Sequence, residues 1–461
     1  MFHRRALRRD ARLRGVVLSL TGLILSGVAE AHPKVAQRED RARVPGQWIV
    51  VLRDEVKDQE VDAVAAELAT RGHGQAGHRF SHALKGFVLQ RPDLASPDEV
   101  AQDPRVLFIE PDGTATMFDD SEEGARAAGP KGSRVRSPPP PPPPQQLPTG
   151  IDRVNAELNP AAGAGVNVAV IDTGIQLDHP DLHVVGNVTF VPRTASGKDD
   201  NGHGTHVAGI VGAKDNTIGV VGVAPAVNLY VVKVLDRNGS GFWSDVIKGI
   251  DWVTQNAKTI GVANMSLGSG LTDADDGNCG NTNFDAVHRA ICGSVNAGVV
   301  YVVAAGNSAK DAKDFRPAAY DEVITVSALA DSDGQPNGQG SVTSFGRDDA
   351  FATFSNVGLD IDLIAPGVDI LSTWIGSSYK TISVTSMSAP HVTGAVALWL
   401  ALHPRPVTGN AKDPAIQGLL ADISEAVGRF SGDPDSAAEP MLNADTAAVG
   451  GTGSSVCCAA P

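Results

Sequence analysis

Three short stretches, far apart in the chain, each contain one residue of a type used in nucleophilic catalysis. Val-Ile-Asp-Thr-Gly contains Asp172, Asn-Gly-His-Gly-Thr-His contains His203, and Val-Thr-Ser-Met-Ser-Ala-Pro-His contains Ser386. A serine hydroxyl is a weak nucleophile at neutral pH, but an imidazole can accept its proton while a carboxylate orients the ring. The set predicts acyl transfer with Ser386 as nucleophile, His203 as general base and then acid, and Asp172 as the orienting carboxylate.

These residues must be positioned by regular elements, and residues 145–430 alternate apolar strand patterns with helical patterns. Strands that are apolar on both faces and alternate with helices predict a parallel sheet flanked by helices on both faces, an α/β fold. Sites in such sheets lie at the carboxyl ends of strands. We expect strands at 168–172, 229–234, 262–266, 299–304 and 361–365, and helices at 203–213, 244–255, 285–297 and 386–402.

The part of the chain before this region divides into further segments. Residues 46–118 predict a small α+β module, with strands at 48–52, 86–90 and 106–110 and a helix at 61–71. Seven prolines, Pro138–Pro144, predict a stiff polyproline linker within residues 119–144. Beyond residue 430, Ser, Gly, Asp and Ala dominate, so residues 431–461 are expected to be a loosely ordered tail.

The three catalytic stretches carry a family resemblance. Asp172-Thr173-Gly174, His203-Gly204-Thr205-His206-Val207-Ala208-Gly209 and Thr385-Ser386-Met387, in this order, resemble the subtilisin-like serine proteases from residue 145 to about 430. The resemblance implies a serine endopeptidase, with Asn307 and the backbone N–H of Ser386 as the oxyanion donors. It also implies two substrate-binding edges, with Trp243 near a pocket before the cut: Gly239-Ser240-Gly241 and Ser266-Leu267-Gly268.

Residues 32–118, with the core 46–118, are similar to the inhibitory propeptide of these proteases. The similarity lies in His82-Ala83-Leu84-Lys85-Gly86-Phe87 and Phe108-Ile109-Glu110-Pro111-Asp112. It implies a zymogen that processes itself and is at first inhibited by its own propeptide. A cut near Met117 or Phe118 would leave the prolines on the mature N-terminus, whereas a cut near Gln145 would remove them.

A calcium site follows from the same resemblance. Two segments align without gaps to the strong calcium site of the family: His179-Pro180-Asp181-Leu182 and Asp215-Asn216-Thr217-Ile218-Gly219-Val220. The side chains of Asp181 and Asn216, with Gln145, which matches the ligand that the family brings from its mature N-terminus, would supply oxygen ligands suited to Ca²⁺. The carbonyls of Lys214, Ile218 and Val220 would complete the set.

Two departures from the family pattern leave an alternative open. Val384 stands where most relatives have glycine, and Ser388 where they have alanine. If position 384 requires a positive φ, valine is strained there, and the chain would be a catalytically impaired peptide-binding relative. Two further histidines, His206 and His391, are interpreted as structural.

The N-terminal residues predict an exported protein, and the charge balance limits its partners. The chain has 38 Lys+Arg against 53 Asp+Glu, which argues against nucleic acid as a partner. Six arginines precede the apolar run Gly15–Val28 and Ala29-Glu30-Ala31, so residues 1–31 predict a signal peptide for general secretion, with a membrane anchor as the alternative. Cys279 and Cys292 predict one local disulfide. The adjacent Cys457 and Cys458 leave intermolecular pairing or lipidation open, and we expect a monomer that acts on proteins or peptides.

Overall fold

The computed structural model describes residues 34–36, 43–93, 96–118, 142–425, 430–435, 437 and 439–445. The expected signal peptide, linker residues 119–141 and the pair Cys457 and Cys458 lie outside the described residues. Within the described ranges, every helix is too short or too polar to cross a membrane.

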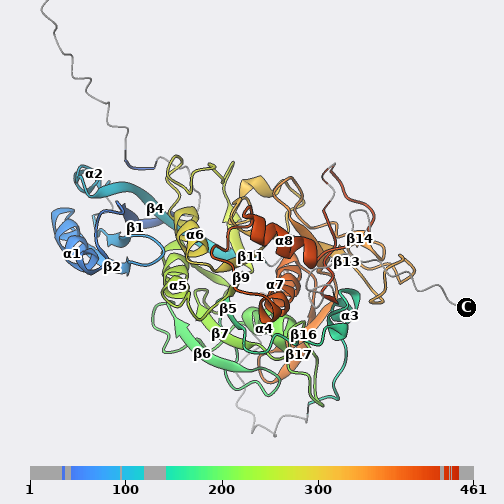
Figure 1. The fold of residues 1–461 in the computed structure, drawn as a ribbon. Coiled ribbons are helices and arrows are strands. Elements are labelled where there is room, and N and C mark those ends of the chain that lie inside the picture. Colours follow the sequence, from blue (N-terminus) through green and yellow to red (C-terminus); the bar gives the residue numbers. More distant parts are fainter. Residues whose placement is uncertain are drawn as a thin grey trace, which may run out of the picture. The chain divides into compact units, whose positions relative to one another are not determined.

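An eight-stranded sheet forms the centre of the body, which we define as residues 142–445 (Figure 1). Its order is β14-β13-β11-β9-β5-β7-β6, with β15 also paired to β13, and only β14 is antiparallel. The chain adds β7 on one side of β5 and β9 on the other, so the strand order reverses at β5. The strands are β5 (Asn167–Asp172), β6 (Val184–Thr189), β7 (Asn228–Lys233), β9 (Val262–Met265), β11 (Val300–Ala304), β13 (Ile324–Ala330), β14 (Ala350–Phe351) and β15 (Leu363–Pro366).

Helices cover both faces of this sheet, because successive side chains of each buried strand point to opposite sides. Val168 and Val170 belong to the hydrophobic cluster that includes α4 (His203–Gly212) and α7 (Thr385–Leu402). Ala169 and Ile171 belong to the cluster of α5 (Trp243–Gln255) and α6 (Ala286–Asn296). The predicted α/β architecture is confirmed.

The C-terminal segment is part of the core, so the expectation of a loosely ordered tail from residue 431 is wrong for residues 439–445. Met441, Leu442 and Ala444 are fully buried in the cluster of α4 and α7. The backbone N–H of Leu442 donates to Ile364 in β15 at 3.0 Å. Helix α8 (Pro414–Asp422) and the hairpin of β16 (Ile370–Trp374) and β17 (Ser378–Ile382) were not predicted either.

The N-terminal module, which we define as residues 43–118, is an antiparallel sheet with two helices. Its elements are β1 (Arg43–Leu52), α1 (Val61–Arg71), β2 (Gln75–Phe80), β3 (Gly86–Gln90), α2 (Asp98–Ala101) and β4 (Val106–Met117). Strand β1 pairs with β3 and β4, and the module has its own hydrophobic cluster around Leu68 and Phe87. Strand β2 was not predicted, because its sequence, QAGHRF, is mostly polar and most of its residues are only partly buried.

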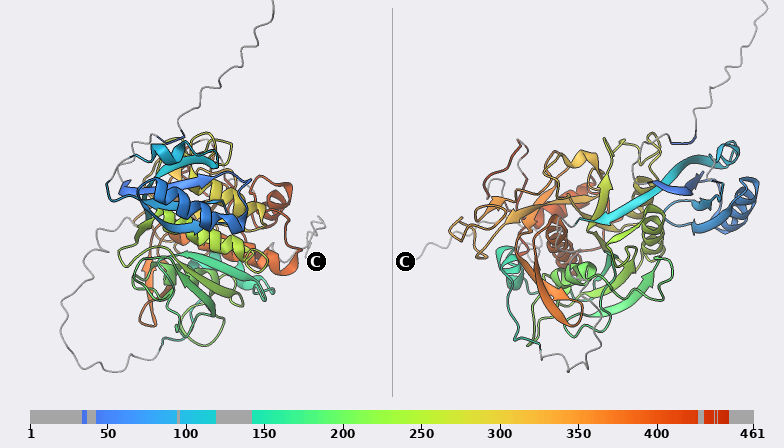
Figure 2. Two further views of the ribbon diagram at one scale, coloured as in Figure 1. Left: turned by 90° about the vertical axis from the view of Figure 1, so that its left-hand side faces the viewer. Right: turned by 180° about the vertical axis from the view of Figure 1, so that it is seen from behind.

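Strand β4 is longer than the predicted 106–110, and its second half extends from the sheet of the module to the body (Figure 2). Its first half pairs with β1. Its second half pairs on one side with β8 (Ser240–Phe242) and on the other with β10 (Leu267–Gly270), both in the body. The strand therefore joins the module to the predicted substrate-binding edges.

Carboxylates of both parts fix the module on the body, two of them by contacts with the starts of helices. Asp112 Oδ1 accepts the Ser244 N–H at the start of α5 (3.1 Å), and Glu110 Oε2 accepts the Ala286 N–H at the start of α6 (2.9 Å). Asp251 Oδ1 accepts three backbone N–H groups of the module, from Ser81, His82 and Ala83. Negative charge at a helix N-terminus is favourable.

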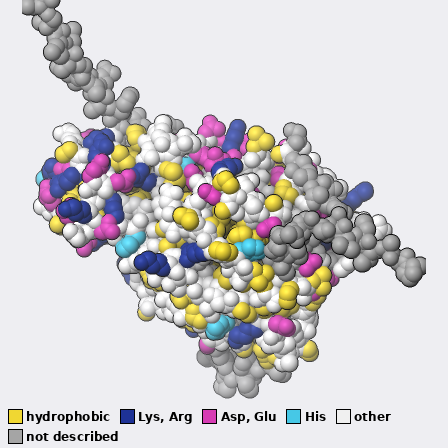
Figure 3. Space-filling model, in the orientation of Figure 1, with side chains coloured by type: hydrophobic (Ala, Val, Ile, Leu, Met, Phe, Trp, Pro, Cys, Tyr) yellow, Lys and Arg dark blue, Asp and Glu magenta, His cyan; other side chains and the backbone are white. Residues whose placement is uncertain are grey.

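On the face drawn in Figure 3, charged side chains of both signs are more densely spaced on the module than on the body.

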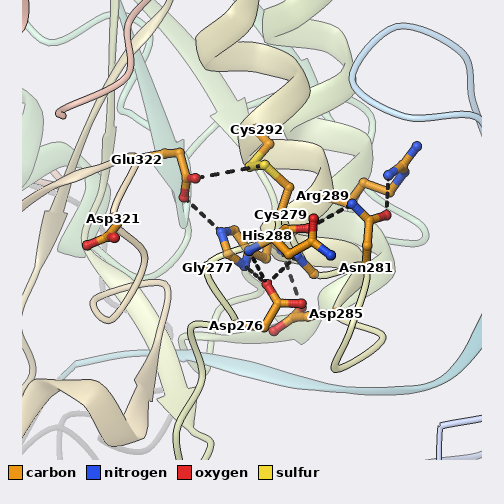
Figure 4. The surroundings of a disulfide bond; sticks show 12 residues. Asp276, Gly277, Cys279, Asn281, Asp285, His288, Arg289, Cys292, Asp321 and Glu322 are labelled. Carbon is orange, nitrogen blue, oxygen red and sulfur yellow. Dashed lines mark hydrogen bonds and ion pairs between the residues drawn. A yellow bond between two sulfur atoms is a disulfide. The ribbon is translucent and has the colours of Figure 1, made fainter. Parts of the chain in front are cut away.

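The predicted disulfide is present and joins Cys279 to Cys292 of α6 (Figure 4). Beside it, the buried His288 stacks on Tyr320, with ring centroids 4.2 Å apart, and its Nε2 lies 2.8 Å from Glu322 Oε2. Glu322 and the nearby carboxylates raise the pKa of His288 despite its burial. The disulfide thus ties the loop before α6 to α6 itself, the helix whose first N–H group donates to Glu110.

Candidate active site

The carboxyl end of β5 places Asp172 at the point where the strand order of the sheet reverses, the usual location of a site in such a sheet. His203 is the first residue of α4. Its Nδ1 lies 2.8 Å from Asp172 Oδ1 and 3.0 Å from Oδ2, with both side chains buried. This hydrogen bond fixes the orientation of the imidazole ring relative to Asp172.

The loop before α4 is ordered by Asp199, a residue that the sequence analysis missed. Its Oδ1 accepts the backbone N–H groups of Asn201 and Gly202, and its Oδ2 accepts the Thr205 N–H and hydroxyl. The Thr173 hydroxyl donates to Oδ1 at 3.0 Å. Asp199 therefore ties the end of β5 to the start of α4. In the sequence, the only indication of this role is that Asp199 stands four residues before His203.

Glycines flank His203 because other parts of the protein approach closely. A Cβ on Gly204 would lie 2.2 Å from the carbonyl oxygen of Gly174, and one on Gly202 (φ +120°) would lie 2.3 Å from the ring of Trp374. The glycines therefore make room for other parts of the protein, the Gly174 carbonyl and the Trp374 ring, and not for a substrate.

Ser386 is the second residue of α7 and is completely buried beneath β4. Its Oγ lies 3.2 Å from the carbonyl oxygen of Phe118, the residue after β4, and 3.4 Å from the carbonyl oxygen of Ser266. The Ser266 hydroxyl donates to the Ser386 carbonyl at 3.0 Å. A hydroxyl near a helix N-terminus experiences a field that favours developing negative charge.

Asn307 follows the carboxyl end of β11, and its amide also faces Phe118. Its Nδ2 donates to the Phe118 carbonyl oxygen at 2.9 Å. The orientation of the amide is fixed by Thr385, whose backbone N–H and hydroxyl both donate to Asn307 Oδ1, at 2.9 and 2.7 Å. Thr385 was noted only as a motif neighbour of Ser386. Its role in orienting Asn307 depends on a contact across the fold.

The two predicted substrate edges lie on opposite sides of β4. Thr116 pairs with Ser240 on one side and Gly268 on the other, and Ala115 pairs with Gly241. The N–H of Met117 donates to the carbonyl oxygen of Gly239 at 2.9 Å, and Met117 is opposite Leu267. An extended segment bound between two strands by its backbone is a common mode of peptide recognition.

Glycines also shape the space around the Phe118 ring. A Cβ on Gly268 would lie 2.3 Å from Phe118 Cζ, and one on Gly306 (φ +105°) would lie 3.7 Å from Cε1. The ring packs against the cluster of α4 and α7. Trp243 is fully buried under the guanidinium of Arg316, with 4.6 Å from Arg316 Cζ to its ring centroid.

Comparison with known proteins agrees with this geometry. Residues 163–437, more than half of the chain, match the model of the subtilase family, Peptidase_S8. The extracellular serine proteinase of Thermus sp. strain Rt41A is 33% identical over 456 residues, which cover 91% of this chain and 97% of the relative. The chain belongs to the subtilase family.

Other relatives agree with this assignment. Subtilisin DY of Bacillus licheniformis is 42% identical over 56% of this chain and 86% of its own length. The crystal structure of a cold-adapted subtilisin-like serine proteinase is 35% identical, with a TM-score of 0.50 over 64% of this chain and 97% of that chain. This subtilase is a serine-type endopeptidase and an extracellular protein, as predicted.

The backbone at Val384 answers the concern about strain in this subtilase. Val384 has φ −165° and ψ 161°, an extended conformation that any residue can adopt. Its side chain is buried in the cluster of α4 and α7. The reason for suspecting an impaired relative, a positive φ at this position, does not apply. The Ser388 hydroxyl is buried without a hydrogen-bond partner among the described residues, and nothing in the structure explains it.

The two histidines interpreted as structural make contacts of that kind. His206 Nε2 lies 2.8 Å from the carbonyl oxygen of Lys380, and burial lowers the pKa of His206 to about 3. His391 Nδ1 lies 2.8 Å from the Met387 carbonyl oxygen, and burial lowers the pKa of His391 to about 4. Both imidazoles are therefore neutral at neutral pH.

The predicted calcium ligands lie together around Asp181. Its Oδ1 accepts from Asn216 Nδ2 at 2.7 Å, and its Oδ2 accepts from the Val220 N–H at 3.1 Å. Gln145 Oε1 accepts the Asn216 N–H at 2.5 Å, and the Ile218 N–H donates to Asn216 Oδ1. The Lys214 ammonium group turns to the Pro180 carbonyl oxygen at 2.8 Å. Segments distant in sequence thus bring the side chains of Gln145, Asp181 and Asn216 together.

Proposed function

We propose that this subtilase is made as a zymogen that cleaves itself after Phe118 and then hydrolyses other proteins by the same site. Ser386 attacks the carbonyl carbon while His203 takes its proton, and His203 gives this proton to the leaving amine as the C–N bond breaks. Water, deprotonated by His203, then hydrolyses the acyl-enzyme ester and the proton returns to Ser386, while Asp172 orients the ring throughout. The observation that carries the proposal is the Phe118 carbonyl oxygen, which lies within hydrogen-bond distance of both Asn307 Nδ2 and Ser386 Oγ.

The register of β4 supports a cut between Phe118 and Asp119. The strand pairs with β8 and β10 as a substrate would, and it ends with the Phe118 carbonyl beside Asn307. As the carbonyl carbon becomes tetrahedral, negative charge grows on its oxygen, where the Asn307 amide can stabilise it. The Ser386 backbone N–H is the proposed second donor.

Inhibition by the module follows from the same contacts. After the cut, β4 would still occupy the groove as a product, held by its pairing and by Glu110 and Asp112 at the starts of α6 and α5. Enzyme activity then requires removal of the module. The ring of Phe118 beside Gly268 and Gly306 favours substrates with a large apolar residue before the cut.

A fluorophosphonate probe tests the proposed nucleophile, since it reacts with activated serine hydroxyls. We expect the mature enzyme to be labelled at Ser386, as located by mass spectrometry of its peptides. Ser388→Ala is a matched control, two residues away on the same helix, and should retain the label. Labelling of the mature enzyme at another serine would overturn the assignment.

We further propose that the site around Asp181 holds a structural Ca²⁺. The ion would be bound by the side chains of Gln145, Asp181 and Asn216, and by the carbonyls of Lys214, Ile218 and Val220. The donors are all oxygen atoms, the type that Ca²⁺ prefers. A half turn of the Asn216 amide would present its oxygen in place of the nitrogen that now faces Asp181, and would give up the bond that Asn216 Oδ1 accepts from the Ile218 N–H.

Chelation tests this calcium site. Treatment with EDTA should lower the melting temperature of the parent, and Asp181→Asn should remove part of that response. An equal response of parent and variant would contradict the assignment.

A further inference from the structure

A second group of carboxylates lies far from the Asp181 site, in the loop of residues 331–349 between β13 and β14. Asp331, Asp333 and Asp348 each offer one oxygen, and these oxygens lie within 4.8 Å of one another. The loop begins directly after the fully buried strand β13. Like charges so close together repel one another, so the loop must be held by other interactions.

Backbone donors hold the loop in this form. Asp348 Oδ1 accepts the Ser332 N–H at 2.8 Å, and its Oδ2 accepts the Gly340 N–H at 2.8 Å. Asp331 Oδ2 accepts the Gly334 N–H at 3.2 Å, in a turn where Gly334 has φ +75°. These bonds fix the direction of the carboxylates without neutralising them.

One oxygen of the group lacks a donor. Asp331 is 1% exposed, and its Oδ1 has no hydrogen-bond partner among the residues that the structure describes. A buried carboxylate oxygen without a partner is costly, and such groups usually pair with a base or coordinate a metal. Burial raises the pKa of Asp331 to about 7, with a smaller contribution from the charge of Asp348, although the nearby Arg153 opposes the shift.

The charges around the group leave it negative. Arg153 is buried nearby and lowers the pKa of Asp331, but its Nε donates to Asp349 Oδ1 at 2.9 Å. Asp152 lies on the other side of the loop, where its Oδ2 accepts from Gln335 Nε2 at 3.1 Å. Arg153 therefore offsets one negative charge among five: Asp152, Asp331, Asp333, Asp348 and Asp349.

We propose that Asp331, Asp333 and Asp348 bind a divalent cation of the Ca²⁺ type, at a site separate from that of Asp181. The donors are carboxylate oxygens on an irregular loop, and Ca²⁺ accepts such ligands at 2.3–2.6 Å in variable geometry, whereas Mg²⁺ demands a near-ideal octahedron. Bound there, the ion supplies the partner that Asp331 Oδ1 lacks and ties the start of the loop to its end.

The group around the disulfide makes a useful contrast. Cys279, Cys292, His288 and Glu322 also lie within ligand distance of one another (Figure 4). Their sulfur atoms are joined to each other, and His288 Nε2 already pairs with Glu322. The sulfur atoms and His288 Nε2 of that cluster are therefore already engaged with one another or with Glu322, whereas Asp331 Oδ1 has no hydrogen-bond partner among the described residues.

Calcium content provides the first test. The full chain is prepared with Ser386→Ala and Asp181→Asn, which prevent self-digestion and remove the other proposed site. After removal of metal by EDTA and titration with Ca²⁺ alone, Asp331→Asn should bind one ion fewer per molecule than this parent. Asp413→Asn, at the start of α8, is the control and should bind as many as the parent. Equal binding by Asp331→Asn would overturn the proposal.

Stability provides a second test that a purely structural role would not reproduce. Without Ca²⁺, Asp331→Asn should melt at the same temperature as the parent or higher, because it removes charge repulsion. In millimolar Ca²⁺ the order should reverse, with the parent higher by roughly 2–6 °C. If Asp331→Asn does not fold, the exposed Asp333→Asn should still show weaker binding, by about three- to tenfold. Parental affinity in Asp333→Asn, or an unchanged order of melting temperatures, would contradict the site.

Discussion

The body and the N-terminal module hold their parts together by different means. In the body, the strands of the central sheet are buried on both faces, and the ends of β5 and β11 lead directly to Asp172 and Asn307. The module contributes one strand, β4, whose second half is held by backbone pairing with β8 and β10 and by polar caps. The catalytic residues on the central sheet keep their positions as long as the body is folded. Strand β4 is held by edge pairing and polar contacts, so it can dissociate from the body.

That difference explains how one molecule can contain both an enzyme and its inhibitor. The module has its own small hydrophobic cluster, so it does not depend on the body for all of its core. Its contacts with the body include a shared cluster, but also buried charges such as Arg316 with Glu110 at 2.8 Å. Buried ion pairs contribute less to net stability than apolar packing of equal size.

The largest effect should come from the body. Asn307→Leu removes the amide that faces the Phe118 carbonyl, while Thr385 loses only its acceptor. We expect kcat on a peptide substrate to fall by about 10²–10³ with little change in KM, the usual cost of one oxyanion donor. Steady-state kinetics of the mature enzyme measure this. A loss confined to KM would mean that Asn307 only binds substrate.

A matched pair of methionines compares the two regions by stability. Met441→Ala opens a cavity in the body's core and should cost about 2–4 kcal/mol of unfolding free energy. Met117→Ala, on the partly buried end of β4, should cost less than about 1 kcal/mol. Denaturant unfolding in the Ser386→Ala background gives both values. Equal costs would mean that β4 is as much a part of the core as the C-terminal segment.

The module's attachment should also depend on pH, through Asp112. Burial raises the pKa of Asp112 to about 6, above its ordinary value of 3.8, so the folded state binds a proton that the unfolded chain releases. The stabilisation from that proton is complete below about pH 4 and is lost as the pH rises through about 6. Asp112→Asn stays neutral throughout. In the Ser386→Ala background the two chains should be equally stable at pH 4, and the parent weaker by about 2 kcal/mol at pH 7. Parallel profiles would show that Asp112 does not titrate in this range.

The smallest effect should come from the ring at the end of β4. Phe118→Ala empties the space beside Gly268 and Gly306 but leaves the pairing of β4 intact. We expect self-processing to slow by about tenfold, since one side chain in an apolar pocket contributes roughly 1–3 kcal/mol. A time course of processing by gel or mass spectrometry measures it. An unchanged rate would mean that the Phe118 ring does not contribute to recognition of the cleavage site.

Much of the body could be predicted from the sequence because its signals are local. The strands around Val168 and Val302 are continuous apolar runs, and Asp172, His203 and Ser386 lie in short motifs at the ends of elements. The role of Thr385 could not be predicted, because it depends on a contact with Asn307 across the fold.

The second half of β4 could not be predicted either, because Pro111, Asp112 and Gly113 interrupt its apolar pattern. Its partners are more than 100 residues away in the sequence. The C-terminal segment was misjudged for a related reason. Met441 and Leu442 are two apolar residues in a polar region, and only the fold reveals that they complete the core.

The intact masses of the purified parent and of Ser386→Ala, prepared side by side, test the central claim most directly. Cleavage by the chain's own site predicts a new N-terminus at Asp119 in the parent, with the module either bound or lost, and an uncut Phe118–Asp119 bond in the variant. The same processed mass in both preparations would contradict self-cleavage by Ser386.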